Sequence, residues 1–531
     1  MRFFPLAIAA LAGFSAVSLH AQQVTPVVET DKGQVQGLED DGVDAYYGLR
    51  YAAPPTGELR FKAPVPAEPW DGIYDATAMG APCMQFYTPS GPVQTDQTRR
   101  MQSIFPTYGE EKIDNEDCLF LNVWTPDATS GSRPVMVWFH GGGYAYGSGN
   151  WPAYDGRNLA AKGDVVVVTV NHRLNAFGYL NLAGRFGEEY AASGNVGNLD
   201  LVRSLEWVRD NIASFGGDPG NVTIMGESGG GSKVSHLMAM PSANGLFDKA
   251  IVQSGPGVTS GKPAEAAAYA ADILDEAGIA TLQELQTVSA DAIIAAARRA
   301  TPAAIGFGRG PSFGPIADGA IVPRDPFLPS APEQSADIPL LIGYNKDEMT
   351  LFLAAQPWFG RLTNEMLDTM APQMGAQAVA AVAAYREMYP GYSPTHIASA
   401  AMGSRFVRGT YLLADQQSRT ARAPVFVYRL TWETPVAGGA LKSPHTLDIP
   451  LMFDNAAESA ALVGEGEAPA RMAAMMSDAW ISFARTGVPS SPLLPEWRAY
   501  SEGERAVMDL DLEPVLRNDP EAAIRTLSSA N

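Results

Sequence analysis

Short apolar runs rich in β-branched residues recur along the chain from residue 119 onward, and amphipathic segments lie between them. The run VVVVTV at 165–170 is typical, because unbroken apolar and β-branched character indicates a strand buried on both faces. The clearest amphipathic segment spans 198–215. The pattern predicts strands at 119–124, 135–139, 165–170, 222–225, 250–253, 340–343 and 425–430.

This alternation predicts an α/β fold, in which a mostly parallel central sheet carries helices on both faces. Chemistry in such sheets gathers at the carboxyl ends of the strands. Alternating runs at 34–37 and 45–51 predict a small N-terminal antiparallel β element. Ala-rich helical segments at 259–304 and 366–401 predict side-lobe insertions, and no linker separates them. Residues 22–531 are therefore expected to form one large domain.

The first residues differ from the rest. Arg2 precedes an apolar run at 3–19, and Ala21 offers a small residue for cleavage. Residues 1–21 are predicted to be a signal peptide, so the protein is expected to be exported, either periplasmic or secreted. The apolar run is short for a membrane span and no stop-transfer pattern follows, so no membrane span is expected.

The formal net charge of −21 argues against nucleic acid and anionic membrane surfaces as partners. Two cysteines are present, Cys83 and Cys118, and an even count in an exported chain favours a disulfide. The polar segment at 88–112 lies between them and is expected to be a surface loop.

The segment NVTIMGESGGGSK at 221–233 carries the first candidate chemistry. A strand pattern precedes Ser228 and a helical pattern follows it, which is the setting of the G-x-S-x-G nucleophile elbow. Gly226 and Gly230 suit the sharp turn, because larger side chains there would clash. Ser228 is therefore the candidate nucleophile, with its Oγ exposed at a helix N-terminus.

A nucleophilic serine needs a base, and the chain has 6 histidines. Those set aside are His20 in the signal peptide, His140 and His172 at strand ends, and His236 on the helix that leaves the elbow. His445 lies in a loop after the last strong strand pattern, where an α/β hydrolase places its histidine. His396 lies in a helical side lobe and is expected to be structural.

The acid should fall between the serine and the histidine in the chain. Asp347 and Glu348 both lie just beyond the strand pattern at 340–343, and spacing alone does not choose between them. Asp318 is typical of a turn, and Asp448 is expected to support the His445 loop.

The segment His140-Gly141-Gly142-Gly143 directly follows the strand pattern at 135–139. Successive glycines let the main chain approach a substrate closely with its N–H groups exposed. This segment is the candidate oxyanion hole, and the N–H of Gly229 is a further donor.

In these motifs the chain resembles the type-B carboxylesterases, which include cholinesterases and bacterial p-nitrobenzyl esterases. The resemblance runs from about residue 27 to residue 500. It is carried by YGLRYA at 47–52, EDCLFLN at 116–122, HGGG at 140–143, NHRL at 171–174, FGGDP at 215–219, the elbow, NKDE at 345–348 and the His445 loop.

The resemblance implies an α/β-hydrolase fold with Ser228 as the nucleophile, His445 as the base and Glu348, not Asp347, as the acid. The further roles that it implies are an oxyanion hole at Gly142, Gly143 and Gly229, residues close behind the triad at Glu227 and Ser254, and a bridge from Cys83 to Cys118.

The chain departs from the family at two positions. Gly229 stands where the family usually has alanine, which puts the rigidity of the oxyanion hole in question. Asn175 stands where the family often has glycine.

The expected reaction is hydrolysis of small to medium carboxylic esters through an acyl-enzyme. No metal or organic cofactor is expected, because the histidines are too dispersed for a metal cluster. The alternatives are a non-catalytic cholinesterase-like binding module, whose known members generally lack the nucleophile, and amide or peptide hydrolysis by the same triad. The aromatic residues expected either to line the site or to pack are Tyr144, Tyr146, Trp151 and Trp358. The sequence assigns neither the natural ester nor an oligomeric state.

Overall fold

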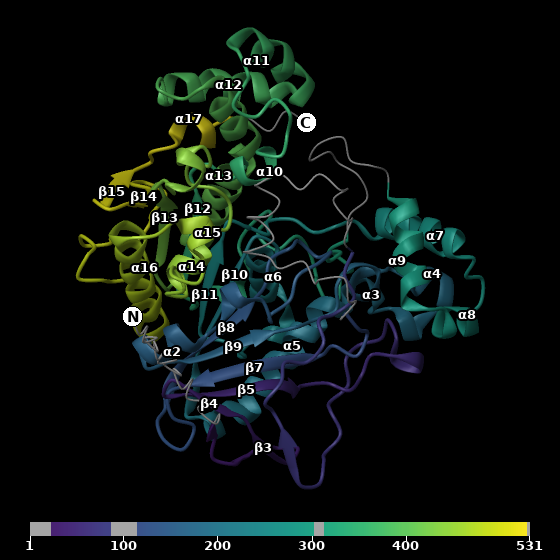
Figure 1. The fold of residues 1–531 in the computed structure, drawn as a ribbon. Helices are drawn as coiled ribbons and strands as arrows, with labels where there is room; N and C mark the ends of the chain where they lie inside the picture. Colours follow the sequence, from purple (N-terminus) through teal and green to yellow (C-terminus); the bar gives the residue numbers. More distant parts are fainter. Residues whose placement is uncertain (1–22, 87–113, 302–312, 528–531) are drawn as a thin grey trace, which may run out of the picture.

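The computed structural model describes residues 23–86, 114–301 and 313–527, and a 12-stranded sheet forms its centre (Figure 1). The predicted signal peptide and the predicted loop at 88–112 lie outside the described residues. In sheet order the strands are β1 (Gln23–Val24), β4 (Leu38–Asp40), β5 (Val43–Arg50), β7 (Phe120–Thr125), β9 (Val166–Val170), β8 (Arg133–Phe139), β10 (Gly217–Glu227), β11 (Lys249–Gln253), β12 (Leu340–Asn345), β13 (Val425–Leu430), β14 (Ala506–Leu510) and β15 (Val515–Asn518).

The middle of the sheet is parallel and its two ends are antiparallel. Strands β9, β8, β10, β11, β12, β13 and β14 pair in parallel. The pairs at the ends, including β7 with β9 and β14 with β15, are antiparallel. Every strand predicted between residues 119 and 430 is present, and the mostly parallel sheet is confirmed.

Neighbouring residues of the central strands point into two separate apolar cores. In β8, Val135, Val137 and Phe139 face one core, whereas Met136 and Trp138 face the other. This division follows from the two-residue period of a strand. It is also the reason that the central strands are continuous apolar runs.

Helices cover both faces of the sheet (Figure 1). On one face lie α5 (Val196–Asn211), α6 (Gly229–Ala239) and α13 (Pro394–Thr420); on the other lie α2 (Arg157–Gly163), α14 (Asp448–Met452) and α16 (Glu467–Thr486). The remaining α-helices are α3 (Asn175–Tyr179), α4 (Ala183–Phe186), α7 (Pro263–Ala277), α8 (Leu282–Thr287), α9 (Ala290–Ala300), α10 (Thr350–Leu353), α11 (Asn364–Met370), α12 (Ala376–Met388), α15 (Ala460–Val463) and α17 (Ala522–Arg525).

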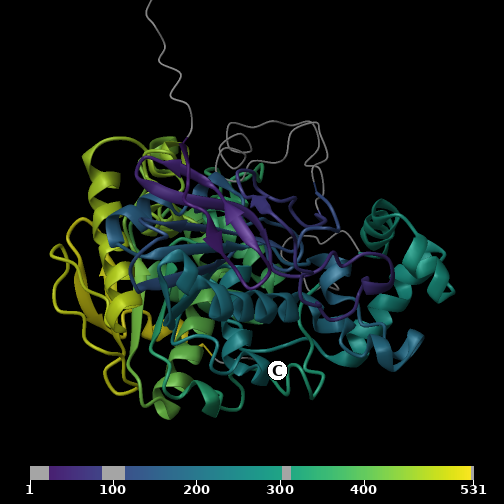
Figure 2. The same ribbon diagram turned by 90° about the horizontal axis from the view of Figure 1, so that it is seen from below.

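Two groups of helices project from this layered body, as predicted. Helices α7, α8 and α9 extend on the side away from α16 (Figures 1 and 2). They pack on an apolar cluster of their own, which includes Ile273, Leu285 and Ile293. Helices α11 and α12 form the second group, at the top of Figure 1. Both groups are insertions beside the sheet and add no strand to it.

The N-terminal β element is a 3-stranded sheet of β2 (Val28–Glu29), β3 (Gln34–Gln36) and β6 (Ile73–Asp75). Strand β3 is antiparallel to β2 and parallel to β6. The run predicted at 45–51 lies elsewhere, in β5 of the large sheet, where it pairs with β4 and β7. Apolar residues on both faces of β5, such as Ala45 and Tyr46, explain its place in the larger sheet.

Cys83 and Cys118 form the expected disulfide, and both residues are buried. The bridge joins the segment after the small sheet to the residues that lead into β7. Across the described ranges, no helix is both long and apolar enough to cross a bilayer.

Replacing both Cys83 and Cys118 with alanine should lower the free energy of unfolding by about 2–4 kcal/mol, because the bridge constrains a long loop in the unfolded chain. Thermal unfolding of the double variant should begin a few degrees below that of the wild type. Reductant should lower the wild-type transition similarly and leave the double variant unaffected. An unchanged transition in the double variant would show that the bridge adds no stability.

Candidate active site

Ser228 occupies a strained turn between β10 and α6. Its backbone has φ 56° and ψ −121°, a conformation that residues other than glycine seldom adopt. A Cβ on Gly230 would lie 2.0 Å from the carbonyl oxygen of Phe139, and one on Gly226 would lie 2.5 Å from the carbonyl carbon of Gly230. Only glycine fits at either position, as the elbow pattern requires.

The other candidate groups follow neighbouring parallel strands. Phe139 at the end of β8 is in register with Gly226, and Glu227 at the end of β10 is in register with Gln253 at the end of β11. The HGGG segment, Ser228 and the loop after β12 therefore meet at one edge of the sheet.

The imidazole of His445 contacts Glu348. Nδ1 of His445 lies 2.5 Å from Oε2 of Glu348, and both side chains are buried. The other oxygen of Glu348 accepts a hydrogen bond of 2.9 Å from the backbone N–H of Asn345. Asp347 has a different role, because its carboxylate accepts the N–H of Ser443 at 3.3 Å and so supports the loop that carries His445. The two neighbouring acids thus divide between the imidazole and its loop.

The second imidazole nitrogen faces a second carboxylate. Nε2 of His445 lies 3.1 Å from Oε1 of Glu227. Within the described part of the chain, no hydrogen bond joins Ser228 to His445. Burial disfavours the charged imidazole, but the charges of Glu227 and Glu348 outweigh that effect and raise the pKa of His445 to about 9. Burial raises the pKa of Glu227 well above its usual range.

Asp448 connects the His445 loop to the sheet. Its carboxylate accepts hydrogen bonds of 2.8 Å from the amide of Gln253 and the hydroxyl of Tyr428, and one of 3.2 Å from the amide of Asn345. Gln253 also accepts the N–H of Ser228 on its backbone carbonyl, at 2.8 Å. Gln253 of β11 therefore contacts both the turn of Ser228 and Asp448, which supports the His445 loop.

The HGGG segment presents its N–H groups. Gly142 and Gly143 have positive φ angles of 82° and 63°. Among the described residues, none accepts a hydrogen bond from the N–H of Gly142, Gly143 or Gly229. These are the N–H groups that the sequence marks as oxyanion donors. The backbone of Gly143 lies directly against Gly229, where an added Cβ would be 2.2 Å from the oxygen of Gly143.

The remaining histidines have other partners. His396 contacts Ser393 at 2.9 Å and the carbonyl of Ala440 at 3.0 Å, as suits a structural residue. His140 stacks on His172 with ring centroids 4.6 Å apart, and burial holds the pKa of both well below the usual range. His236 binds the carbonyl of Ser232 and the hydroxyl of Ser260.

Ser254 follows β11 with φ 49°, and its N–H donates to the carbonyl of Gly343 at 2.8 Å. Its backbone lies against that of Ser228, since a Cβ on the adjacent Gly255 would be 1.8 Å from the carbonyl oxygen of Ser228. Of the aromatic candidates, Trp151 is buried among core residues, whereas Tyr146 is 39% exposed.

Asn175, which the sequence marks as a departure from the family, has φ 46°, a left-handed conformation that asparagine tolerates in place of glycine. Another residue near the site, Lys233, belongs to no motif that predicts a role for it. Lys233 on α6 is fully buried and binds backbone carbonyls of the HGGG segment. A lysine on the apolar face of a predicted helix was the available signal.

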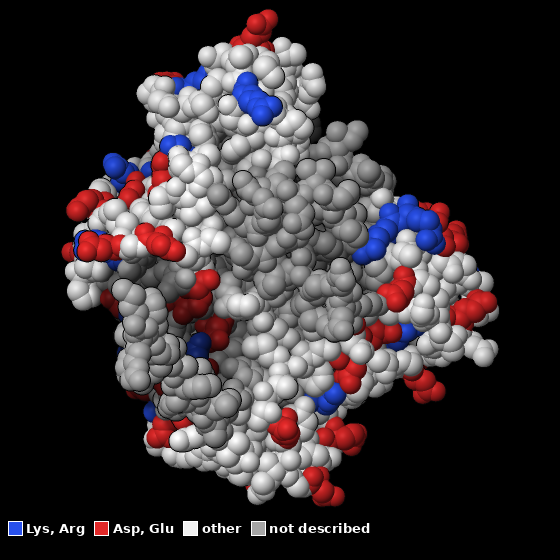
Figure 3. Space-filling model, viewed as in Figure 1, with Lys and Arg blue, Asp and Glu red and all other residues white. Residues whose placement is uncertain are grey.

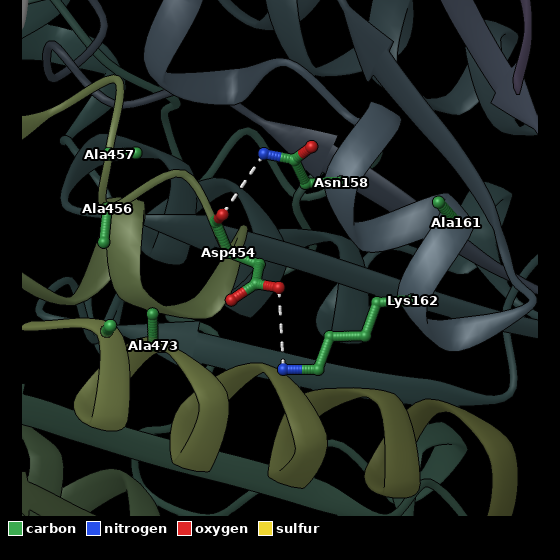
Figure 4. A pocket seen from close by; sticks show the side chains of 8 residues that line it. Asn158, Ala161, Lys162, Asp454, Ala456, Ala457 and Ala473 are labelled. Atoms are coloured by element: carbon green, nitrogen blue, oxygen red, sulfur yellow. Dashed lines mark hydrogen bonds and ion pairs between the residues drawn. The ribbon is translucent and has the colours of Figure 1, made fainter. Parts of the chain in front are cut away.

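A surface pocket of about 440 Å³ lies away from these groups, between α2, α16 and residues 454–457, which follow α14 (Figure 4). Its Lys162 lies 3.5 Å from the carboxylate of Asp454, and none of the candidate catalytic residues lines it. No cluster of three or more potential metal ligands occurs in ranges 23–86, 114–301 and 313–527. Acidic side chains are dispersed over the described part of the face in Figure 3, in keeping with the net charge of −21.

Known proteins share both the sequence and the fold. A model of the carboxylesterase family matches residues 24–525. Para-nitrobenzyl esterase of Bacillus subtilis is 39% identical over 505 residues, which cover 94% of this chain and 97% of that protein. Phenmedipham hydrolase of Pseudarthrobacter oxydans is 34% identical, over 91% of this chain and 94% of its own.

Among solved structures, a carboxylesterase of Geobacillus stearothermophilus matches with a TM-score of 0.79 and 37% identity, over 94% of this chain and 99% of that one. The match of the family model and the extent of these relatives show that the chain belongs to the carboxylesterase family and is a carboxylic ester hydrolase with the α/β-hydrolase fold.

Proposed function

We propose that the chain hydrolyses carboxylic esters through an acyl-enzyme on Ser228, with His445 as the general base and Glu348 as the acid that orients it. The carrying observation is that a strained serine turn and a buried His445–Glu348 pair lie at the same edge of the sheet. Glu348 accepts the Nδ1 proton of His445, which leaves Nε2 unprotonated and able to take the proton of the serine.

In the first half of the reaction, Oγ of Ser228 attacks the ester carbonyl and its proton passes to Nε2 of His445. The bond from the carbonyl carbon to the alcohol oxygen then breaks, and the alcohol leaves with that proton. In the second half, water attacks the acyl-enzyme by the same transfer, and the acid is released with Ser228 restored.

The oxyanion of each tetrahedral intermediate binds the N–H groups of Gly142, Gly143 and Gly229. These N–H groups have no acceptor among the described residues, which supports this role, because donors that are already aimed at the developing charge need no reorganisation during the reaction. Each such donor contributes about 2.7–4 kcal/mol of transition-state stabilisation.

The Glu227 carboxylate lies beside the imidazole nitrogen that takes the serine proton. Nε2 of His445 lies 3.1 Å from Oε1 of Glu227, and that oxygen has no hydrogen-bond partner among the described residues. Catalytic hydrogen bonds often shorten only when substrate binds. We infer that the hydrogen bond from Ser228 to Nε2 of His445 likewise forms in the substrate complex.

The substrates are proposed to be small to medium esters, since the named relatives include a para-nitrobenzyl esterase. The acidic net charge supports a small molecule and disfavours nucleic acid as partner. We also infer cleavage of residues 1–21 and export of one domain, 22–531, to the periplasm or beyond. The Cys83–Cys118 bridge supports export, because disulfides persist in oxidising compartments.

Ser228→Ala should lower kcat for p-nitrophenyl ester hydrolysis at least about 1,000-fold, because the acyl-enzyme loses its attachment atom. His445→Ala should do the same, while His396→Ala, the matched control, should leave the rate near that of the wild type. Circular dichroism and thermal unfolding check that each variant is folded. Substantial activity in Ser228→Ala would reject this nucleophile, and a large loss in His396→Ala with none in His445→Ala would reject the base.

The same assay, run beside a matched p-nitroanilide, separates the alternatives. Faster hydrolysis of the anilide would reject ester hydrolysis as the main activity. Hydrolysis of neither substrate would favour a binding module.

Glu227→Gln should move the acidic limb of the kcat/KM–pH profile to lower pH, by about 1–3 units. The base is active only when unprotonated, and the wild-type limb should therefore lie toward the His445 pKa of about 9. The Glu227 carboxylate raises that pKa, so removing its charge lowers it, and the observed value belongs to the coupled pair. An unmoved limb would contradict charge coupling between Glu227 and His445.

A further inference from the structure

Lys233 is a buried lysine that has no acidic partner in the part of the chain that the structure describes. It follows Gly229 by four residues on α6, so both residues share the helix face toward the HGGG segment. Its exposed fraction is 0%, and no described carboxylate lies within ion-pair distance of it. Its Nζ donates instead to the backbone carbonyls of His140, at 2.8 Å, and Gly143, at 3.0 Å.

These two carbonyls match the two N–H donors of a neutral amine. Burial lowers the pKa of Lys233 to about 7. A neutral amine still carries two N–H donors, and two carbonyl acceptors are present. Burying an amine without such acceptors would be strongly unfavourable.

The other carbonyls of the HGGG segment are also bound within the protein. The carbonyl of Gly141 contacts Nδ1 of His140 at 2.9 Å, and that of Gly142 accepts the N–H groups of Ala145 and Tyr146 at 3.3 Å. All four carbonyls from 140 to 143 therefore have protein partners. A peptide unit joins the C=O of one residue to the N–H of the next and directs the two oppositely. The bound carbonyls of Gly141 and Gly142 therefore set the direction of the N–H groups of Gly142 and Gly143, and Lys233 fixes the peptide units on either side of these two.

Tyr144 continues this anchoring beyond the glycines. Its hydroxyl lies 2.7 Å from Oγ of Ser232, the residue before Lys233, and its ring centroid lies 5.4 Å from Nζ of Lys233. From the opposite side, the N–H of Asn175 donates to the carbonyl of Tyr144 at 2.6 Å. The segment is held between α6 and the start of α3.

Gly229 makes the contact with α6 sterically feasible. A Cβ at this position would lie 2.2 Å from the oxygen of Gly143 and 2.5 Å from its Cα, too close without a backbone shift. Because Gly229 has no side chain, the HGGG segment packs directly against α6, and Nζ of Lys233 reaches the carbonyl of Gly143. Gly229 therefore permits close packing at the proposed oxyanion hole and does not loosen it.

We propose that Lys233 is a positioning residue of the oxyanion hole: it ties the carbonyls of His140 and Gly143, which flank the two donor peptide units, to α6 and so holds the N–H groups of Gly142 and Gly143 in place toward the carbonyl oxygen of the substrate. The proposal rests on the catalytic role proposed for Ser228 and these donors.

The test compares Lys233→Met with the wild type on a p-nitrophenyl ester and on its thiono analogue, in which sulfur replaces the carbonyl oxygen. Methionine has a similar length and no N–H donor, so the segment loses its tie. We expect kcat for the ester to fall about 10- to 100-fold with little change in KM, because misplaced donors weaken transition-state binding. Sulfur accepts hydrogen bonds weakly, so kcat for the thiono ester should fall much less than kcat for the ester. The ratio of kcat/KM for the ester to kcat/KM for the thiono ester should therefore fall about 10-fold.

Lys249→Met is the matched control, because Lys249 is partly buried at the opposite end of the neighbouring strand β11 and binds Asn221. It should leave the ester-to-thiono ratio at the wild-type value. An unchanged ratio in Lys233→Met would overturn the proposal, even if the overall rate fell, because a purely structural defect would slow both substrates equally. Ser228→Ala is measured alongside, since retained activity there would refute the proposed function instead.

Gly229→Ala disturbs the same contact between Gly143 and α6, because the added methyl group would push Gly143 away. This variant replaces Lys233→Met in the test if Lys233→Met does not fold. It should displace Gly143 and lower the ester-to-thiono ratio likewise. In a folded double variant the two losses should be less than multiplicative, because both changes break one contact. A ratio unaffected by Gly229→Ala, or fully multiplicative losses, would overturn the proposal.

Discussion

The close approach of three backbone segments is the constraint on which the site depends. The end of β8, the end of β10 and the first turn of α6 meet at Phe139, Gly226 and Gly230 with no room for a Cβ. This packing places Ser228 in a backbone conformation that an isolated chain would avoid. Burial of the central strands in two cores supplies the stability that maintains the strain. The strained turn of Ser228, the proposed nucleophile, is therefore a consequence of the whole layered fold.

The electrostatics of the site follow from burial of several acids around one imidazole. Glu227 and Glu348 contact opposite nitrogens of His445, and Asp448 lies close behind them. In a medium of low polarity, these charges strongly favour a protonated histidine. The Lys233 amine is bound to neutral carbonyls of the HGGG segment. Acidic groups thus surround His445, the proposed base, whereas N–H donors gather at the HGGG segment, the proposed oxyanion hole.

Much of this architecture was predictable from the sequence, because its signals are local. Buried parallel strands have continuous apolar runs, and the glycines at 226 and 230 report a steric requirement of the turn. Contacts between distant segments were not predictable in this way. Spacing could not separate Asp347 from Glu348, since only the fold shows which of the two reaches His445.

The place of the run at 45–51 was missed for the same reason. Its alternation is compatible with either sheet, and long-range packing assigns it to β5. Lys233 went unnoticed because its carbonyl partners lie some 90 residues earlier in the chain. Every residue carries a backbone carbonyl, so the sequence does not indicate which carbonyls will bind a lysine.

Gln253 links the turn of Ser228 to the loop that carries His445. It lies on β11, the single strand between β10, which leads into Ser228, and β12, which precedes Glu348. It contacts the turn of Ser228 and Asp448, which supports the His445 loop. Neighbouring strands are about 4.8 Å apart, a spacing set by backbone hydrogen bonds and independent of side-chain identity. The strand spacing of the sheet therefore sets the separation between the loops that carry Ser228 and Glu348. Changes in the outer helices that leave these strands paired would leave this separation unchanged.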